Sequence, residues 1–215
     1  MKIINLIDRE DLESLLINKG QNQVNAKMEL FAEQVPSIEK LEDLKTLDQL
    51  FYSNFTLDKT TSKFECTSAE IFERATYSGC SDIGLALAPI LRMKGVPTVY
   101  VESAHIDWIK EVQNDTEKKE LMQGHIFLEI YLDGSWYLYD PTFHLVYLDY
   151  NYNNPFLPRG YVVFAKSLNC HELGIHSVQD EKRVGNTQVK DFDLTKYSAP
   201  NHQMIDLREK RFCKN

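Results

Sequence analysis

Ser78-Gly79-Cys80-Ser81-Asp82 opens the segment that decides the fold, because the residues that follow, Ile83 to Met93, are apolar almost all round. A helix without a polar face belongs in the centre of a domain. Cys80 would lie in its first turn, where unpaired backbone N–H groups and the helix dipole favour the thiolate, the nucleophilic form of cysteine. This stretch therefore predicts a central helix that carries a candidate nucleophile at its start.

The composition is that of a folded chain. Of its 215 residues, 43 % are hydrophobic and 11 % aromatic, which is enough for a packed core and argues against disorder. We expect a core at 61–215, ending in strands and a tail. Residues 1–60 are expected to form an N-terminal helical extension packed on that core.

Charge and cysteine content limit the partners. The net charge of −8 argues against a nucleic-acid partner, and no apolar run approaches the length of a membrane span. The N-terminus meets charged residues too early for a signal peptide, so we expect a cytoplasmic protein. The four cysteines form no close pairs, which argues against a zinc site or a disulfide framework, and we expect no metal and no cofactor.

Periodicity and capping residues outline the other elements. Helices are predicted over 8–20, 24–35, 38–55 and 69–77, and strands over 98–101, 145–148 and 161–164. The last fifty residues show little patterning. The order of helices, central helix and strands indicates an α+β protein.

The clearest strand signal is a hairpin around Asp133-Gly134. The segments 125–132 and 135–140 flank this dipeptide, which favours a two-residue turn. Such a turn places Leu132 opposite Ser135, so that His125 and Asp140 become diagonal neighbours on one face, roughly 7–8 Å apart at the backbone. A slip of one residue would put the two side chains on opposite faces, and His144 would then be the first substitute for His125.

A histidine held by a carboxylate is what a cysteine nucleophile requires. The imidazole stabilises the thiolate and later protonates the leaving group, while the carboxylate fixes the ring tautomer. Each residue alone has an ordinary structural role: a cysteine in an apolar helix is usually core, and an aspartate before proline is usually a turn residue. Only the conjunction of Cys80, His125 and Asp140 predicts chemistry.

Three blocks of the sequence, in this order, resemble the transglutaminase-like core. That family has a Gly-Cys helix start with a Leu-Arg…Gly-Ile-Pro helix exit, a strand with a histidine, and a Trp…Asp-Pro-Thr strand. The matching blocks, within about residues 65 to 145, are Gly79–Asp82 with Leu91–Pro97, Gly124–Ile130, and Trp136–Thr142.

The resemblance implies a papain-like α+β fold, in which the central helix with the cysteine packs on an antiparallel sheet that carries the histidine and the aspartate. Cys80 would be the nucleophile, His125 the base and Asp140 the orienting carboxylate. The implied activity is cysteine-dependent acyl transfer at an amide or peptide bond through a thioester. We favour a peptidase, amidase or deamidase over a crosslinking transferase. No acidic calcium loop is present, which disfavours the calcium-dependent enzymes.

Substrate contacts are assigned to Trp108, Tyr77 and Trp136. The backbone N–H of Cys80 would supply one oxyanion donor, with Tyr77 or Ser78 as candidates for the second. Two alternatives remain open. One is a non-catalytic transglutaminase-like module that binds a protein or glycan partner. The other is a structural metal site at Cys66, Cys80 and a histidine, although the spacing of these cysteines fits no common ligand pair.

Overall fold

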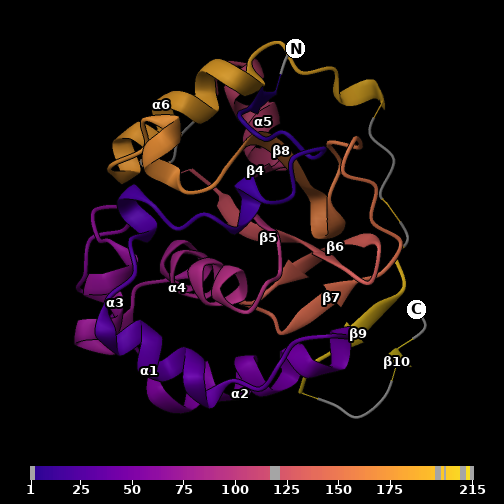
Figure 1. The fold of residues 1–215 in the computed structure, drawn as a ribbon. Helices are drawn as coiled ribbons and strands as arrows, with labels where there is room; N and C mark the ends of the chain where they lie inside the picture. Colours follow the sequence, from indigo (N-terminus) through magenta and orange to yellow (C-terminus); the bar gives the residue numbers. More distant parts are fainter. Residues whose placement is uncertain (1–2, 117–121, 197–199, 201, 209–211, 214–215) are drawn as a thin grey trace.

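The central helix predicted from the sequence is present as α4 (Cys80–Met93), and every residue from Ser81 to Arg92 is buried. In the computed structural model, which describes residues 3–116, 122–196, 200, 202–208 and 212–213, α4 lies between the N-terminal helices and a large sheet (Figure 1). An apolar helix acquires this position because it can lose water on all sides. The prediction of a buried central helix is confirmed.

The other elements surround α4. The remaining α-helices are α1 (Ala26–Gln34), α2 (Leu44–Asn54), α3 (Ser68–Arg74), α5 (Ile106–Gln113) and α6 (Val178–Val189). The strands are β1 (Ile4–Asn5), β2 (Thr56–Leu57), β3 (Thr76–Tyr77), β4 (Thr98–His105), β5 (Gly124–Leu132), β6 (Ser135–Asp140), β7 (Leu145–Tyr147), β8 (Tyr161–Ser167), β9 (Met204–Asp206) and β10 (Phe212–Cys213).

The main sheet of the described residues has the strand order β1-β8-β4-β5-β6-β7-β9-β10, while β2 and β3 form a separate parallel pair. All neighbours in the main sheet are antiparallel except β1 and β8, which are parallel and pair Ile4 with Ala165. The molecule is therefore a mixed α+β protein with β5 and β6 in the middle of the strand order.

The β5–β6 hairpin has the predicted register. Leu132 pairs with Ser135, and Leu128 pairs with Tyr139. Both turn residues have positive φ, 48° at Asp133 and 74° at Gly134, as a type I′ turn requires. The two-residue turn thus fixes which side chains of the two strands share a face, and the register prediction is confirmed.

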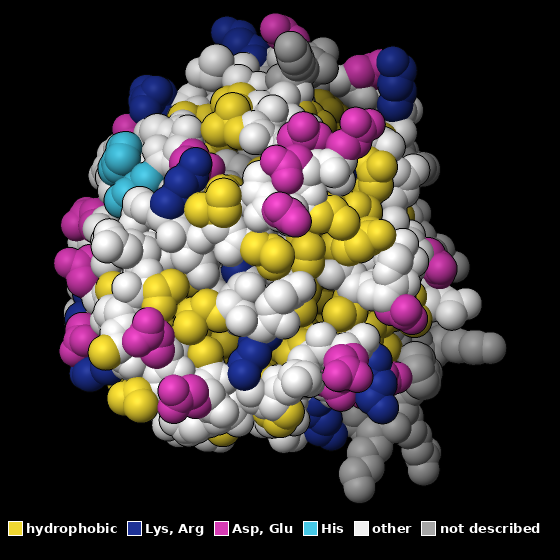
Figure 2. All heavy atoms as spheres, in the orientation of Figure 1, with side chains coloured by type: hydrophobic (Ala, Val, Ile, Leu, Met, Phe, Trp, Pro, Cys, Tyr) yellow, Lys and Arg dark blue, Asp and Glu magenta, His cyan; other side chains and the backbone are white. Residues whose placement is uncertain are grey.

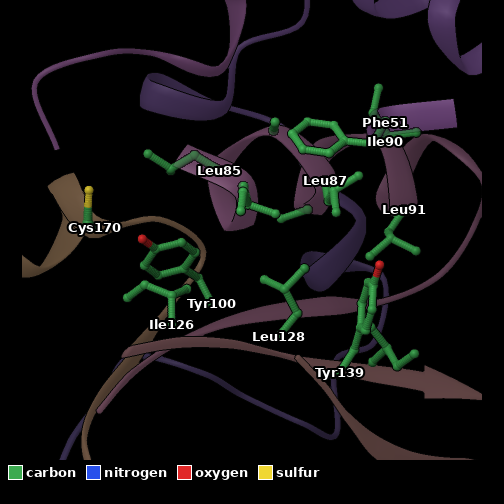
Figure 3. Packing of buried hydrophobic residues seen from close by; sticks show 14 of the residues in the cluster. Phe51, Leu85, Leu87, Ile90, Leu91, Tyr100, Ile126, Leu128, Tyr139 and Cys170 are labelled. Carbon is green, nitrogen blue, oxygen red and sulfur yellow. The ribbon is translucent and has the colours of Figure 1, made fainter. Parts of the chain in front are cut away.

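Helix α4 approaches the sheet closely at Gly84. A Cβ atom at this position would lie 2.8 Å from Cγ2 of Ile126 and 3.0 Å from Cε2 of Tyr100. Leu85, Leu87 and Leu91 of α4 belong to the same buried cluster as Tyr100, Ile126, Leu128 and Tyr139 of the sheet, and Figure 3 shows Leu91 beside Tyr139. Because Gly84 is one turn after Cys80, this contact holds the start of α4 near the beginning of β5.

The N-terminal helix predicted over 8–20 is wrong. Only short 3-10 turns form there, at Ser14–Leu16 and Gly20–Asn22. The side chain of Asp8 accepts a hydrogen bond from the N–H of Glu10 at 3.0 Å, and that of Asp11 accepts one from Ser14 at 3.2 Å. Such local bonds stabilise turns in competition with the helix. The predicted helices over 24–35 and 38–55 are present as α1 and α2.

Helix α6 was not expected. Ser177 caps it by accepting a hydrogen bond from the N–H of Asp180 at 3.1 Å, but the helix is mostly polar. Its buried positions include Glu181 and Gly185, which interrupt an apolar stripe. A strongly polar amphipathic helix gives little periodic signal in the sequence. Of the predicted C-terminal tail, residues 209–211 and 214–215 lie outside the described part.

Residues of the first sixty positions contribute to the common core. Met28, Leu47 and Phe51 belong to the same buried cluster as α4, and β1 extends the main sheet. A chain division at residue 60 stays a prediction. On the face drawn in Figure 2, Lys and Arg side chains are scattered among Asp and Glu side chains. Among the described residues, no helix has the length and apolar character needed to cross a bilayer.

Candidate active site

Cys80 is the first residue of α4, is partly exposed and forms no disulfide. The loop before it is held by Asp82, whose Oδ2 accepts hydrogen bonds from the N–H and the hydroxyl of Ser78, both at 2.8 Å. Both donors of Ser78 are therefore engaged, which argues against Ser78 as an oxyanion donor. The first N–H groups of α4 have no acceptor within the helix, and they surround Cys80 with positive partial charge.

His125 and Asp140 form the pair that the hairpin register predicted. Nε2 of His125 lies 3.0 Å from Oδ1 of Asp140. His125 is the second residue of β5 and Asp140 is the last residue of β6, so neighbouring strands supply the two side chains. The carboxylate is completely buried, and its Oδ1 also accepts a hydrogen bond from the N–H of Phe143 at 3.3 Å.

The surroundings of His125 stabilise its charged form. Burial opposes the positive charge, but hydrogen bonds with Asp140 and with the Cys80 side chain outweigh burial and raise the pKa of His125 to about 9. At neutral pH the ring is therefore an imidazolium, ready to pair with a thiolate and to donate a proton. The structure thus brings together Cys80, His125 and Asp140, the three residues predicted from the sequence.

Aromatic rings fix the orientation of the imidazole. The ring of His125 lies 4.7 Å from Phe127, 5.1 Å from Tyr161 and 5.6 Å from Phe143, measured between ring centroids. Phe143 is 37 % exposed, so this side of the site reaches the surface. Arg159 lies above the Phe143 ring, and its Nη1 is 3.7 Å from Oδ2 of Asp140.

Tyr77 and Tyr52 lie beside the site. Tyr77 is partly buried in β3, and its ring is 5.9 Å from that of Tyr52. The Tyr52 hydroxyl donates a hydrogen bond to the carbonyl of Pro141 at 2.8 Å. Burial, followed by the charges of Asp48 and other nearby groups including Asp140 and Cys80, raises the pKa of Tyr52. Tyr52 was missed because its contact with the site depends on where α2 packs.

The other two predicted substrate contacts lie elsewhere. Trp108 is completely buried in α5, against Gly185 of α6, so it offers no surface that a substrate could contact. The prediction of Trp108 as a groove residue took a polar surrounding sequence as a sign of exposure. Trp136 is the second residue of β6, at the opposite end of the strand from Asp140, and it packs against Tyr131. The structure does not bring Trp136 together with Cys80.

A second His–Asp pair lies next to the first. Nδ1 of His144 is 2.6 Å from Oδ2 of Asp48 in α2, and Oδ1 of Asp48 accepts a hydrogen bond from the Tyr139 hydroxyl at 2.9 Å. His144 follows Asp140 in the turn between β6 and β7. Asp48 was not recognised in the sequence, although it shares the buried face of α2 with Leu44, Leu47 and Phe51.

Two acidic side chains also border the site, on the face of the sheet that carries α4. Glu102 is opposite Ile126 in the sheet, and both of its carboxylate oxygens are buried without a hydrogen-bond partner in the described residues. The carboxyl group of Glu181 fills the space beside Gly124, where a Cβ atom would lie. Burial raises the pKa of Glu181 to about 7, and burial together with Glu181 and Cys80 raises that of Glu102.

The part of the chain that the structure describes contains no group of three or more His, Cys, Asp and Glu side chains suited to hold a metal ion. Cys66 and Cys170 are buried in the core, and burial raises the pKa of both thiols. The reactive form of these two cysteines is therefore suppressed.

Comparison with known proteins supports the fold. No family model and no curated protein sequence matches the chain. A similar solved structure is that of a "Putative Cysteine Protease" from Cytophaga hutchinsonii, with a TM-score of 0.53 and 15 % sequence identity. The likeness covers 78 % of this chain and 50 % of the Cytophaga chain, so this chain matches about half of that protein. The chain therefore has a cysteine-protease-like fold.

Proposed function

We propose that the protein is a cysteine-dependent acyl-transfer enzyme of the transglutaminase-like superfamily, acting as a hydrolase on an amide or peptide bond. The observation that carries this proposal is the 3.0 Å contact between His125 and Asp140 beside a cysteine at the start of a buried helix. The cysteine-protease-like fold of the neighbouring structure supports the same class of chemistry.

The reaction begins with the Cys80 thiolate. Its sulfur attacks the carbonyl carbon of the substrate, and the electron pair of the C=O bond moves to oxygen. The N–H groups at the start of α4 face the developing negative charge. As the oxyanion collapses, the C–N bond breaks, His125 donates its proton to the leaving nitrogen, and a thioester remains on Cys80.

Water then resolves the thioester. The ring of His125, now neutral, accepts a proton from a water molecule, whose oxygen attacks the thioester carbon. Collapse of the second oxyanion breaks the C–S bond and releases the carboxylic acid, and the thiolate–imidazolium pair is restored. Asp140 holds the ring in one orientation and stabilises its positive charge in both halves of the reaction.

The proposal is tested by alkylating Cys80 with iodoacetamide across a range of pH. We expect labelling at pH 6.5 to be at least about 10-fold faster than that of glutathione, because a free thiol ionises only near pH 8.5. The His125→Ala variant should lose this advantage. A Cys80→Ser variant measures labelling of the other cysteines and serves as the background.

A Cys80 that reacts no faster than glutathione would contradict the enzyme and support a non-catalytic binding module. Where rapid labelling is found, a library of amide and peptide substrates identifies the acyl donor. Release of free acid, rather than of a product joined to an added amine, distinguishes a hydrolase from a transferase.

A further inference from the structure

Arg159 is held at the candidate active site by an unusual backbone conformation. It has φ 62° and ψ 24°, and Gly160 follows with φ 80°. A left-handed conformation is costly for a residue with a long side chain and is found where the surrounding structure imposes it. Here the N–H of Leu157 donates to the carbonyl of Tyr161, and the N–H of Val163 donates to that of Pro155, both at 2.8 Å.

The guanidinium group lies at the rim of the site, with room for a ligand. It is 3.3 Å from the centroid of the Phe143 ring, which is itself 5.6 Å from the ring of His125. The Arg159 side chain is 39 % exposed. Planar stacking of this kind fixes the direction of the guanidinium plane and leaves its edge open to other groups.

The guanidinium of Arg159 is close to Asp140 without a direct hydrogen bond to it. Its Nη1 is 3.7 Å from Oδ2 of Asp140, which is an ion pair but lies beyond hydrogen-bond distance. Within the described residues, the guanidinium donates no hydrogen bond, and Oδ2 of Asp140 accepts none. If Arg159 served only to hold Asp140, a two-pronged bond to the carboxylate would be expected. Its N–H groups are instead left for an external acceptor.

We propose that Arg159, stacked on Phe143, binds a carboxylate of the substrate, a few bonds away from the amide that Cys80 attacks. The substrate class is therefore an anionic acyl donor, and this inference rests on the proposed function. A planar guanidinium matches a carboxylate through two parallel hydrogen bonds, which gives orientation as well as affinity. The chain has a net charge of −8, which repels an anionic substrate, and a cation beside the candidate triad offsets this repulsion locally.

The test compares two maleimides that alkylate Cys80 and differ only at the end of the same linker. One is N-(2-carboxyethyl)maleimide, and the other is its carboxamide. The ratio of the two rates cancels any change in the reactivity of the thiol itself. In the Arg159→Gln variant we expect this ratio to fall about 10-fold, the size of one charge-assisted hydrogen bond. Glutamine, like arginine, carries a Cβ atom, so the strain of the left-handed backbone at this position is the same in both chains.

Matched variants identify the origin of the ratio. Lys63 is another exposed cation near Cys80, with its Cε 3.7 Å from where a Cβ of Gly79 would lie. Lys63→Gln should leave the ratio unchanged, whereas an equal fall in Lys63→Gln and Arg159→Gln would overturn the proposal in favour of a general electrostatic field. Phe143→Leu, which removes the stacking platform, should lower the ratio, and Arg159→Lys should restore only part of it.

The two proposals fail in different ways. In one case both maleimides react quickly with Cys80, both reactions depend on His125, and the ratio of the two rates is the same in the original chain and in Arg159→Gln. The proposed carboxylate subsite is then wrong, and the proposed enzyme function is unaffected. If neither maleimide reacts faster with Cys80 than with glutathione, the proposed function is wrong, and the subsite with it. Thermal unfolding of each variant verifies that the compared chains are folded.

Discussion

The molecule contains two His–Asp pairs that look alike as pairs and differ in what surrounds them. His125 lies 3.0 Å from Asp140 and has the Cys80 side chain as a further partner. His144 lies 2.6 Å from Asp48, and the second oxygen of that carboxylate binds Tyr139. A His–Asp pair is thus not by itself a sign of catalysis. The two pairs differ in their third residue, which is Cys80 in one and Tyr139 in the other.

The two pairs are also positioned by different parts of the fold. Adjacent strands fix His125 and Asp140, while Asp48 joins α2 to a turn in which His144 has φ 61°. The carbonyl of His144 accepts a hydrogen bond from the N–H of Leu207 at 2.8 Å. The His144–Asp48 pair therefore connects three distant segments of the chain. We interpret it as a structural clamp beside the candidate triad.

Replacing the two histidines should separate their roles most clearly. We expect His125→Ala to reduce the rate of Cys80 alkylation at pH 7 by about 30-fold, because only about one in thirty free thiols is ionised at that pH. His144→Ala should change it less than about 3-fold, because Cys80, His125 and Asp140 remain in place. Rates are measured with iodoacetamide and corrected with Cys80→Ser. Equal losses in the two variants would mean that the pairs act as one unit.

The second prediction concerns pH and stability. Because the pKa of His125 is raised from 6.5 to about 9 in the folded chain, its contribution is complete below pH 6.5 and is lost as the pH rises through 9. This interval corresponds to about 3 kcal/mol of unfolding free energy. The free energy of unfolding in urea is measured from pH 6 to 9.5 for the original chain and for His125→Gln. The difference between the two free energies should fall by this amount as the pH rises.

The matched control for the pH measurement is His144→Gln, which should retain the fall because His125, Asp140 and Cys80 are unchanged. A difference between the original chain and His125→Gln that stays constant over this pH range would show that the imidazole is not held in its charged form. Glu181 is present in all three chains, so its own titration near pH 7 cancels in the comparison.

The third prediction compares the two carboxylates, Asp48 and Asp140, by their effects on stability and on the alkylation rate. Asp48→Asn should lower the free energy of unfolding by about 2 kcal/mol, because the buried carboxylate holds both His144 and Tyr139. Its effect on the Cys80 alkylation rate should stay within about 3-fold. Asp140→Asn should instead reduce that rate by at least about 10-fold, since an amide does not stabilise the imidazolium. Urea unfolding and alkylation of both variants give the two quantities, and the interpretation fails if Asp48→Asn affects the rate more than Asp140→Asn.

The smallest expected effect is that of Tyr52→Phe. This change removes the hydrogen bond to the carbonyl of Pro141 and should cost about 1 kcal/mol of unfolding free energy. The ring stays in place against His144, 4.4 Å away between centroids. Urea unfolding measures the loss, and Tyr137→Phe on the partly exposed part of β6 serves as the control with a smaller change.

The parts of the site that could be predicted are those set by local geometry. The Asp133-Gly134 turn has one favoured conformation, which fixes the hairpin register and so places His125 next to Asp140. The apolar run after Cys80 leaves little choice but a buried helix. These inferences use neighbours in sequence or across one turn, where steric rules are strong.

What could not be predicted depends on tertiary packing. Asp48 and Tyr52 reach the site only because α2 packs beside the turn after β6, and no local pattern records that contact. Glu102 stands in a strand as a charged residue, which normally indicates a solvent-facing position, yet it is completely buried. Trp108 failed for the converse reason, because a polar stretch of sequence surrounded a core residue.

The parallel pairing of β1 with β8 also sets an order of events during synthesis. Ile4 pairs with Ala165, so β1 cannot pair with β8 until Ala165 has been synthesised. At cellular rates of translation this delay is roughly 10 to 30 s. By then α4 and the β5–β6 hairpin, which carry Cys80, His125 and Asp140, have already been made. The nascent chain therefore contains all three residues of the candidate triad before β1 can pair with β8.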